Sequence, residues 1–123
     1  MKLHASTPGG AHVVTAYGDD YVAINGVRYT ESIVVLPGRV APWSAPSFAA
    51  LTAEHFSALL ELDAEILILG TGPKQRFPHR GLTAPLAQAR VGLEVMSLQA
   101  ACRTYNILMA EERNVAAALL LIA

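Results

Sequence analysis

A short run of basic side chains is the strongest candidate for chemistry in this 123-residue sequence. Four groups that carry or can take up a positive charge fall within seven residues: Lys74, Arg76, His79 and Arg80. The guanidinium of arginine is a planar fork of donors that grips a carboxylate or phosphate at two points. Pro78 breaks the segment, so Arg76 and Arg80 can turn toward one anion, with Phe77 as an apolar contact. The run predicts a site for a phosphate, a carboxylate or an acidic partner surface, and the alternative is a solvated loop.

A glycine-containing turn precedes this run. Gly70-Thr71-Gly72 follows the apolar segment 65–69, and α/β sheets bind ligands where such strands end. A dinucleotide fingerprint needs a third glycine where Gln75 stands, and Pro73 removes an N–H from a phosphate cradle. We therefore expect a tight turn rather than a nucleotide site. A small-ligand site at this place would use seven residues: Gly70, Thr71, Gly72, Lys74, Arg76, Arg80 and Arg103.

Neither a nucleophile nor a metal site is indicated by residue spacing. Cys102, the single cysteine, lies more than one turn past the expected helix cap Ser97 and shares an apolar stripe with Tyr105. We therefore expect a buried, unreactive thiol. The four histidines are scattered singly, and the sequence has no Gly-x-Ser-x-Gly elbow. The sequence predicts no catalytic residue, no metal site and no cofactor.

The elements that must position these residues begin with an antiparallel hairpin. Asn25-Gly26 suits a two-residue type I′ turn, because both central residues of that turn need positive φ. Its arms are residues 21–24 and 27–30, and the valine-rich segment 12–17 is expected to be another strand.

Three later segments are apolar without alternation: residues 32–36, 65–69 and 115–122. Runs of this kind are typical of strands buried on both faces. Residues 93–96 add a short strand, whereas residues 39–47 indicate an irregular connection pinned by Trp43.

Apolar spacing predicts three helices between these strands. The first runs through residue 62 after the cap Thr52, the second covers residues 85–90 with Thr83 as its cap, and Ser97 caps the third. Helices alternating with apolar strands predict an α/β fold with a mostly parallel central sheet, preceded by the antiparallel hairpin.

Composition sets the class of protein. Hydrophobic residues make up 53% and charged residues 15%, which predicts a single globular domain over residues 1–123, with residues 1–11 loosely ordered. The net charge of −1 gives no general attraction to nucleic acid. The longest apolar run, residues 115–123, is about half of the ~20 residues needed to span a bilayer. One cysteine and no targeting segment favour a cytoplasmic protein.

Several groups of residues, taken in order, resemble one protein family. They are residues 25–27, Leu36-Pro37 with Trp43, residues 70–72 with Phe77-Pro78, residues 92–96, residues 100–106 and residues 115–119. This is a small, largely uncharacterised α/β family of bacteria and archaea that also includes the mitochondrial NADH dehydrogenase (complex I) assembly factor three. The resemblance covers residues 13–122. It implies a single three-layer domain in which a small antiparallel sheet packs on a mixed sheet with helices on the other face. Many relatives have glycine where Glu112 stands, so we expect Asn114 to take the left-handed helix end.

Two functions remain open. The first is a non-enzymatic binding or assembly module that acts through contact with an as yet unidentified protein, with weak homodimerisation as a further option. The second is a small-molecule or anion-binding protein, or an enzyme, that uses the loop after strand 65–69. An enclosed cleft with convergent polar groups would favour the second, and an apolar surface patch the first.

Overall fold

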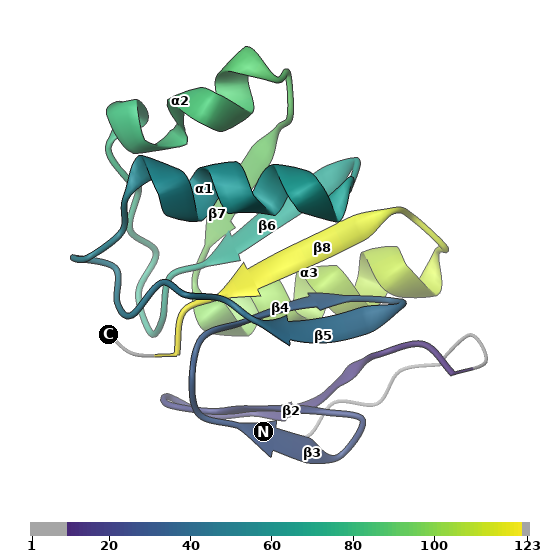
Figure 1. The fold of residues 1–123 in the computed structure, drawn as a ribbon. Helices are drawn as coiled ribbons and strands as arrows, with labels where there is room; N and C mark the ends of the chain where they lie inside the picture. Colours follow the sequence, from purple (N-terminus) through teal and green to yellow (C-terminus); the bar gives the residue numbers. More distant parts are fainter. Residues whose placement is uncertain (1–9, 122–123) are drawn as a thin grey trace.

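Two β-sheets form the frame of the computed structural model, which describes residues 10–121 (Figure 1). The smaller sheet is antiparallel in the order β1-β2-β3, with β1 (Val14–Tyr17), β2 (Val22–Ile24) and β3 (Val27–Tyr29). The larger sheet has the order β5-β4-β8-β6-β7, with β4 (Ile33–Leu36), β5 (Arg39–Pro42), β6 (Ile66–Gly70), β7 (Leu93–Met96) and β8 (Val115–Leu119). Residues 1–9, most of the segment expected to be loosely ordered, and Ile122 of the last predicted strand lie outside the described residues.

The hairpin turn between β2 and β3 has the predicted conformation. Asn25 and Gly26 both have positive φ, at 49° and 83°, and Ile24 pairs with Val27 across the turn. Asn25 also ties the turn to the start of the small sheet, because its Oδ1 accepts from the Val13 N–H at 2.9 Å. The type I′ hairpin is therefore confirmed.

The larger sheet is mixed. β6 runs parallel to both β7 and β8, while β4 is antiparallel to its neighbours β5 and β8. Four of its five strands therefore point the same way, and β4 alone is reversed. The predicted mostly parallel central sheet and the α/β fold class are confirmed.

Each face of the larger sheet carries its own apolar core. One core lies under α1 (Ala53–Leu59), its 3₁₀ extension (Leu60–Leu62) and α2 (Arg80–Gln88), and is built around Phe56 and Leu86. The other lies between the sheet, the small sheet and α3 (Leu98–Ala110), and is built around Tyr105 and Ile68. Figure 1 shows α1 and α2 on one side of the sheet, with α3 and the small sheet on the other.

The connection predicted as irregular over residues 39–47 begins with a strand. Arg39–Pro42 pairs antiparallel with β4, so Pro37-Gly38 forms a hairpin turn. β5 is an edge strand with exposed ends, which hides the apolar pattern of a buried strand, and an edge tolerates the terminal Pro42. Trp43 then pins the connection as predicted, because it is buried and its indole N–H donates to the His55 carbonyl at 3.1 Å.

The second helix starts earlier than predicted. α2 begins at Arg80 rather than Pro85, and His79 rather than Thr83 is its N-cap, with its Nδ1 accepting from the Gly81 N–H at 3.0 Å. Pro85 lies inside the helix. A proline is most often found in the first turn, which is why the sequence pattern placed the helix start too late.

The helix ends show another difference from prediction. Thr52 caps α1 and Ser97 caps α3 as expected, with Ser97 Oγ accepting from the Ala100 N–H at 3.3 Å. After α3, however, Glu112 itself takes the left-handed conformation, with φ 61°, and Asn114 does not. The Asn114 side chain instead donates to the Asp63 carbonyl at 2.9 Å.

Among residues 10–121, no helix is both long enough and apolar enough to cross a membrane.

Candidate functional site

The hydroxyl of Thr71 shapes the loop that leaves β6. Thr71 is fully buried, and its Oγ1 donates to the Lys74 carbonyl at 2.6 Å, with Met96 O 3.2 Å away. The same oxygen accepts from the Arg76 N–H at 3.0 Å. These contacts hold the backbone of Lys74 and Arg76 close to the end of β6. Thr71 itself is enclosed by protein.

The two glycines of this turn also have structural reasons. A β-carbon on Gly70 would lie 3.0 Å from Ala101 Cβ and 3.1 Å from Leu119 Cδ2, so glycine allows α3 to approach β6 closely. Gly72 has φ 90°, and its carbonyl accepts from the Leu98 N–H at 2.7 Å at the start of α3. Chain geometry accounts for both glycines without a ligand.

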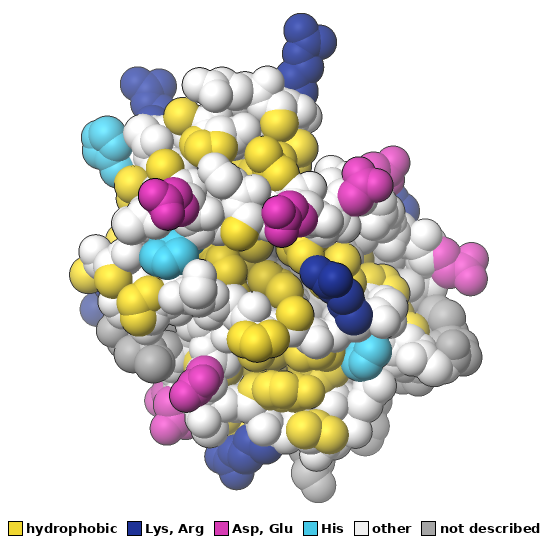
Figure 2. Space-filling view, in the orientation of Figure 1, with side chains coloured by type: hydrophobic (Ala, Val, Ile, Leu, Met, Phe, Trp, Pro, Cys, Tyr) yellow, Lys and Arg dark blue, Asp and Glu magenta, His cyan; other side chains and the backbone are white. Residues whose placement is uncertain are grey.

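The basic residues predicted as a site divide between two sides of the molecule. Lys74, Arg76 and Arg80 follow one another along the loop from β6 into α2, and Lys74 and Arg80 are exposed. The Arg76 guanidinium stacks on the Phe48 ring, 4.4 Å from its centroid. Arg103 lies on α3, across the sheet from α2. On the face drawn in Figure 2, Lys and Arg side chains stand over α2 without Asp or Glu beside them.

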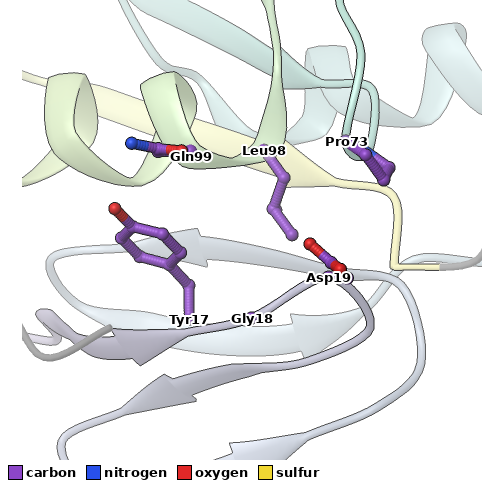
Figure 3. A pocket seen from close by; sticks show the side chains of 6 residues that line it. All are labelled: Tyr17, Gly18, Asp19, Pro73, Leu98 and Gln99. Atoms are coloured by element: carbon purple, nitrogen blue, oxygen red, sulfur yellow. The ribbon is translucent and has the colours of Figure 1, made fainter.

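A small pocket lies next to the glycine turn but lacks basic groups. It measures about 230 Å³ and lies between the small sheet and the start of α3 (Figure 3). Its lining residues are Tyr17, Gly18, Asp19, Pro73, Leu98 and Gln99. The one ionisable carboxylate among them, Asp19, would repel an anion, so this pocket does not join the basic loop into an anion site.

A more open apolar groove lies between α2 and β7, and we refer to it as the α2–β7 groove. It measures about 340 Å³. Its apolar lining residues include Phe77, Pro78, Leu86, Val91, Leu93 and Val95, and Arg80 and Thr83 are its polar members. Phe77 is 72% exposed, whereas Leu86 is buried. Of the predicted site residues, only Arg80 lines this groove.

Cys102 is buried as predicted. Its side chain has no exposed surface, and desolvation raises the pKa of the thiol from 9.0 to about 12. At neutral pH the thiolate, which is the nucleophilic form, is therefore strongly disfavoured.

Within residues 10–121, no three His, Cys, Asp or Glu side chains are grouped so that they could hold a metal ion.

The polar residues of α3 that sequence reasoning left without a role join the two layers. Asn106 is buried and bonds both backbone groups of Val14 in β1, with Val14 N–H donating to its Oδ1 at 2.9 Å and its Nδ2 donating to Val14 O at 2.8 Å. Tyr105 donates its hydroxyl to the His12 carbonyl at 2.7 Å. Both lie in segment 100–106, one of the groups of residues that carry the family resemblance, and Asn106 is a polar residue beside the apolar stripe of α3.

The fold belongs to a known class of domain. The structure matches the solution structure of a Bordetella pertussis protein described as an Mth938-like domain, with a TM-score of 0.75 and 36% identity, covering 98% of this chain and 92% of that one. The chain belongs to the family described as "Protein of unknown function (DUF498/DUF598)", whose profile matches residues 14–120. The predicted family and three-layer fold are confirmed.

Two further relatives place the family in bacteria and in animals. A crystal structure from Bordetella parapertussis has a TM-score of 0.84 and 43% identity, covering 92% of this chain and 98% of that one. The NADH dehydrogenase (ubiquinone) 1 alpha subcomplex assembly factor 3 of Danio rerio is 33% identical over 110 residues, which is 88% of this chain and 63% of the relative. The chain thus spans about three fifths of the length of the curated relatives that it first matches.

Proposed function

We propose that this chain is a non-enzymatic module that binds another protein and assists the assembly of a complex. The observation that carries the proposal is its family membership together with a relative named as an assembly factor, whose similarity covers 88% of this chain. The proposal includes a cytoplasmic location, a single domain and action without a cofactor. Weak homodimerisation remains a further proposal, and the net charge of −1 favours protein over nucleic acid as the partner.

The chemistry of the described residues supports a binding role. Cys102 is buried with a raised pKa, and Thr71 and Asn106 are occupied by hydrogen bonds to backbone groups. The surface instead carries an exposed apolar side chain, Phe77, at the rim of the α2–β7 groove. Exposed apolar surface next to a groove is typical of protein interaction sites.

In-cell crosslinking of the tagged full chain tests this proposal. We expect one or a few proteins to be recovered in amounts comparable to the chain itself, and to be recovered again when the partner carries the tag. Recovery of chaperones alone, at the level obtained with a tagged unrelated domain, would refute it.

We also keep as a proposal that the loop after β6 binds an anion or a small molecule. One observation favours it: residues 66–93 contain Lys74, Arg76, Arg80 and Arg90 but no Asp or Glu. A loop of this charge attracts phosphate and carboxylate groups. Thermal unfolding of the wild type and of the double variant Arg76→Ala, Arg80→Ala in sulfate and phosphate tests it.

A further inference from the structure

Charge is unevenly distributed along the chain. Residues 66–93 hold four of the nine Lys and Arg residues and none of the ten Asp and Glu residues. The rest of the chain therefore has five basic against ten acidic residues. In Figure 2 the acidic side chains of the face shown lie below α2, over α1 and farther down. Of these four residues, Arg80 begins α2 and Arg90 follows it, so the end of the molecule formed by α2 carries basic residues without acidic ones.

The α2–β7 groove lies within this positive end. Arg80, the first residue of α2, lines the groove directly. Arg90 follows the other end of the helix and precedes Val91, which also lines it. Glu94, the first acidic residue after the stretch, belongs to β7 but alternates with Leu93 and Val95, so its side chain faces the opposite side of the strand. Arg80 thus lines the apolar groove, and Arg90 lies next to a lining residue in the chain, beyond the other end of α2.

The groove can accept side chains of a bound partner segment, but its edge at β7 is not free to pair with an added strand. β7 is the last strand in the sheet order, but the Gln75 amide donates to the Val95 carbonyl at 2.8 Å and covers part of this edge. Covering an edge in this way disfavours the addition of a further strand. An occupant would therefore be held by apolar side chains placed between Phe77 and Leu93, over the buried Leu86.

We propose that the α2–β7 groove is the docking site for an acidic segment of a partner protein, with apolar side chains in the groove and carboxylates on Arg80 and Arg90. This inference rests on the proposed function and adds the chemistry of the partner. Carboxylates pair with guanidinium groups, and the apolar contacts supply most of the affinity. A symmetric dimer through this groove is disfavoured, because two such ends would repel each other.

A peptide selection tests this inference on the full chain. A displayed library of short random peptides is selected for binding to the protein, and we expect recovered peptides to combine Leu, Val or Phe with two or more Asp or Glu. Their binding should weaken as salt concentration rises. No enrichment, or enrichment of peptides without acidic residues, would overturn the inference.

Two exposed substitutions and two matched controls locate the binding. Arg80→Glu and Phe77→Ser should each weaken binding of a selected peptide by about tenfold, which corresponds to about 1.4 kcal/mol. Arg39→Glu makes the same charge change on β5, and Ile107→Ser likewise replaces an exposed apolar side chain by serine on α3; both should leave binding unchanged. Thermal unfolding checks that all four variants fold. Equal effects of the test and control substitutions would place the site elsewhere and overturn the inference.

Two further outcomes separate this inference from the proposed function. If crosslinked partners of the full chain persist in Arg80→Glu, the binding function stands but the groove is not its site. If wild type sediments with phosphatidylglycerol vesicles but not with phosphatidylcholine vesicles, and Arg80→Glu abolishes this while peptides do not compete, the surface binds lipid and the inference fails. Loss of one partner in Arg80→Glu, with retention in Arg39→Glu, supports it.

Discussion

At the scale of single residues, the side chains with the most unusual environments hold the layers together. Asn106 bonds both the N–H and the C=O of Val14, as a neighbouring strand would, and so completes the hydrogen bonding of β1 from a helix. Such a backbone-like role needs a side chain with one donor and one acceptor side by side, which Asn and Gln provide without a change of protonation. Sequence pattern could mark Asn106 as a polar residue on an apolar stripe. It could not name Val14 as the partner, because 92 residues separate them.

The replacement Asn106→Leu tests this bridge. It keeps the branched shape of the side chain but leaves two buried backbone groups of Val14 without partners, and should reduce the free energy of unfolding by about 2–4 kcal/mol. Urea unfolding at pH 7 measures the loss. A change below about 0.5 kcal/mol, the level of an ordinary surface substitution, would show that water or another group replaces the amide.

The replacement Asn106→Asp gives the same bridge a pH dependence. The introduced carboxyl can still accept from the Val14 N–H, but when ionised it faces the Val14 carbonyl, so burial and this contact should raise its pKa in the folded state. Because the folded pKa is raised, the folded state is favoured once the group is protonated. The stability deficit relative to wild type should therefore be larger at pH 7 than at pH 5. A deficit independent of pH would contradict this geometry.

The buried thiol of Cys102 predicts a loss of stability at alkaline pH. Burial raises its pKa from 9.0 to about 12, so above pH 9 the unfolded chain releases a proton that the folded chain keeps. The contribution of this thiol to the free energy of unfolding is therefore fully present below pH 9. Between pH 9 and pH 12 it decreases by about 1.4 kcal/mol per pH unit. Chemical unfolding measures the decrease in the free energy of unfolding from pH 8 to pH 10, which should be smaller for Cys102→Ala than for the wild type. Equal drops, or rapid labelling of the native thiol by a maleimide, would show the thiol to be accessible.

At the scale of elements, the sequence predicted the buried strands and helices well, but it did not predict an edge strand or the start of a helix. The apolar runs of β6 and β8 and the stripe of α3 follow from burial, which acts on many residues at once. β5 was missed because an edge strand is half exposed and lacks that pattern. The start of α2 was missed because its cap is His79, which bonds the Gly81 N–H only in this local geometry.

The close approach of α3 to β6 makes Gly70 difficult to replace. A β-carbon there would lie 3.0 Å from Ala101 Cβ, which is fixed to the helix backbone, so Gly70→Ala should push the helix away and cost about 1–3 kcal/mol. The matched control is Gly38→Ala, where nothing lies within 4 Å of the added carbon and φ is not positive. Differential scanning fluorimetry should show a lower Tm for the first variant alone. Similar Tm values for both would mean that the helix can shift without loss of packing.

The end of α3 offers a stabilising substitution. Glu112 has φ 61°, and the N–H groups of Glu112 and Arg113 donate back to Met109 and Leu108, which is the Schellman arrangement that favours glycine. Glu112→Gly should raise stability by about 0.5–1 kcal/mol, and Glu111→Gly, whose φ is −82°, should lower it. Thermal unfolding of the two variants against wild type measures both signs. A decrease for Glu112→Gly would show that its side chain makes a compensating contact.

At the scale of the whole molecule, the larger sheet separates two apolar cores, and the two sides of the molecule differ in what their surfaces carry. The core under the small sheet and α3 contains Cys102, Tyr105 and Asn106 and is closed by internal bonds. The side covered by α1 and α2 carries the groove and the positive charge. The basic run was visible in the sequence because it is contiguous. The groove was not, because it forms only when residues 77–87 meet residues 91–95.

The positive end of the molecule should respond to small anions if the basic loop itself binds them. Sulfate stabilises most proteins by exclusion from their surface, so the informative quantity is the difference between variants rather than the shift itself. An anion present at about five times its dissociation constant adds about 1 kcal/mol, which raises the Tm of a domain this size by a few degrees. Arg76→Ala with Arg80→Ala should reduce the response to sulfate and phosphate, since both side chains lie on the exposed loop and helix start. Arg39→Ala with Arg113→Ala removes the same charge elsewhere and should respond like wild type. If all three proteins respond identically, the loop is a solvated connection, and protein binding alone accounts for the surface.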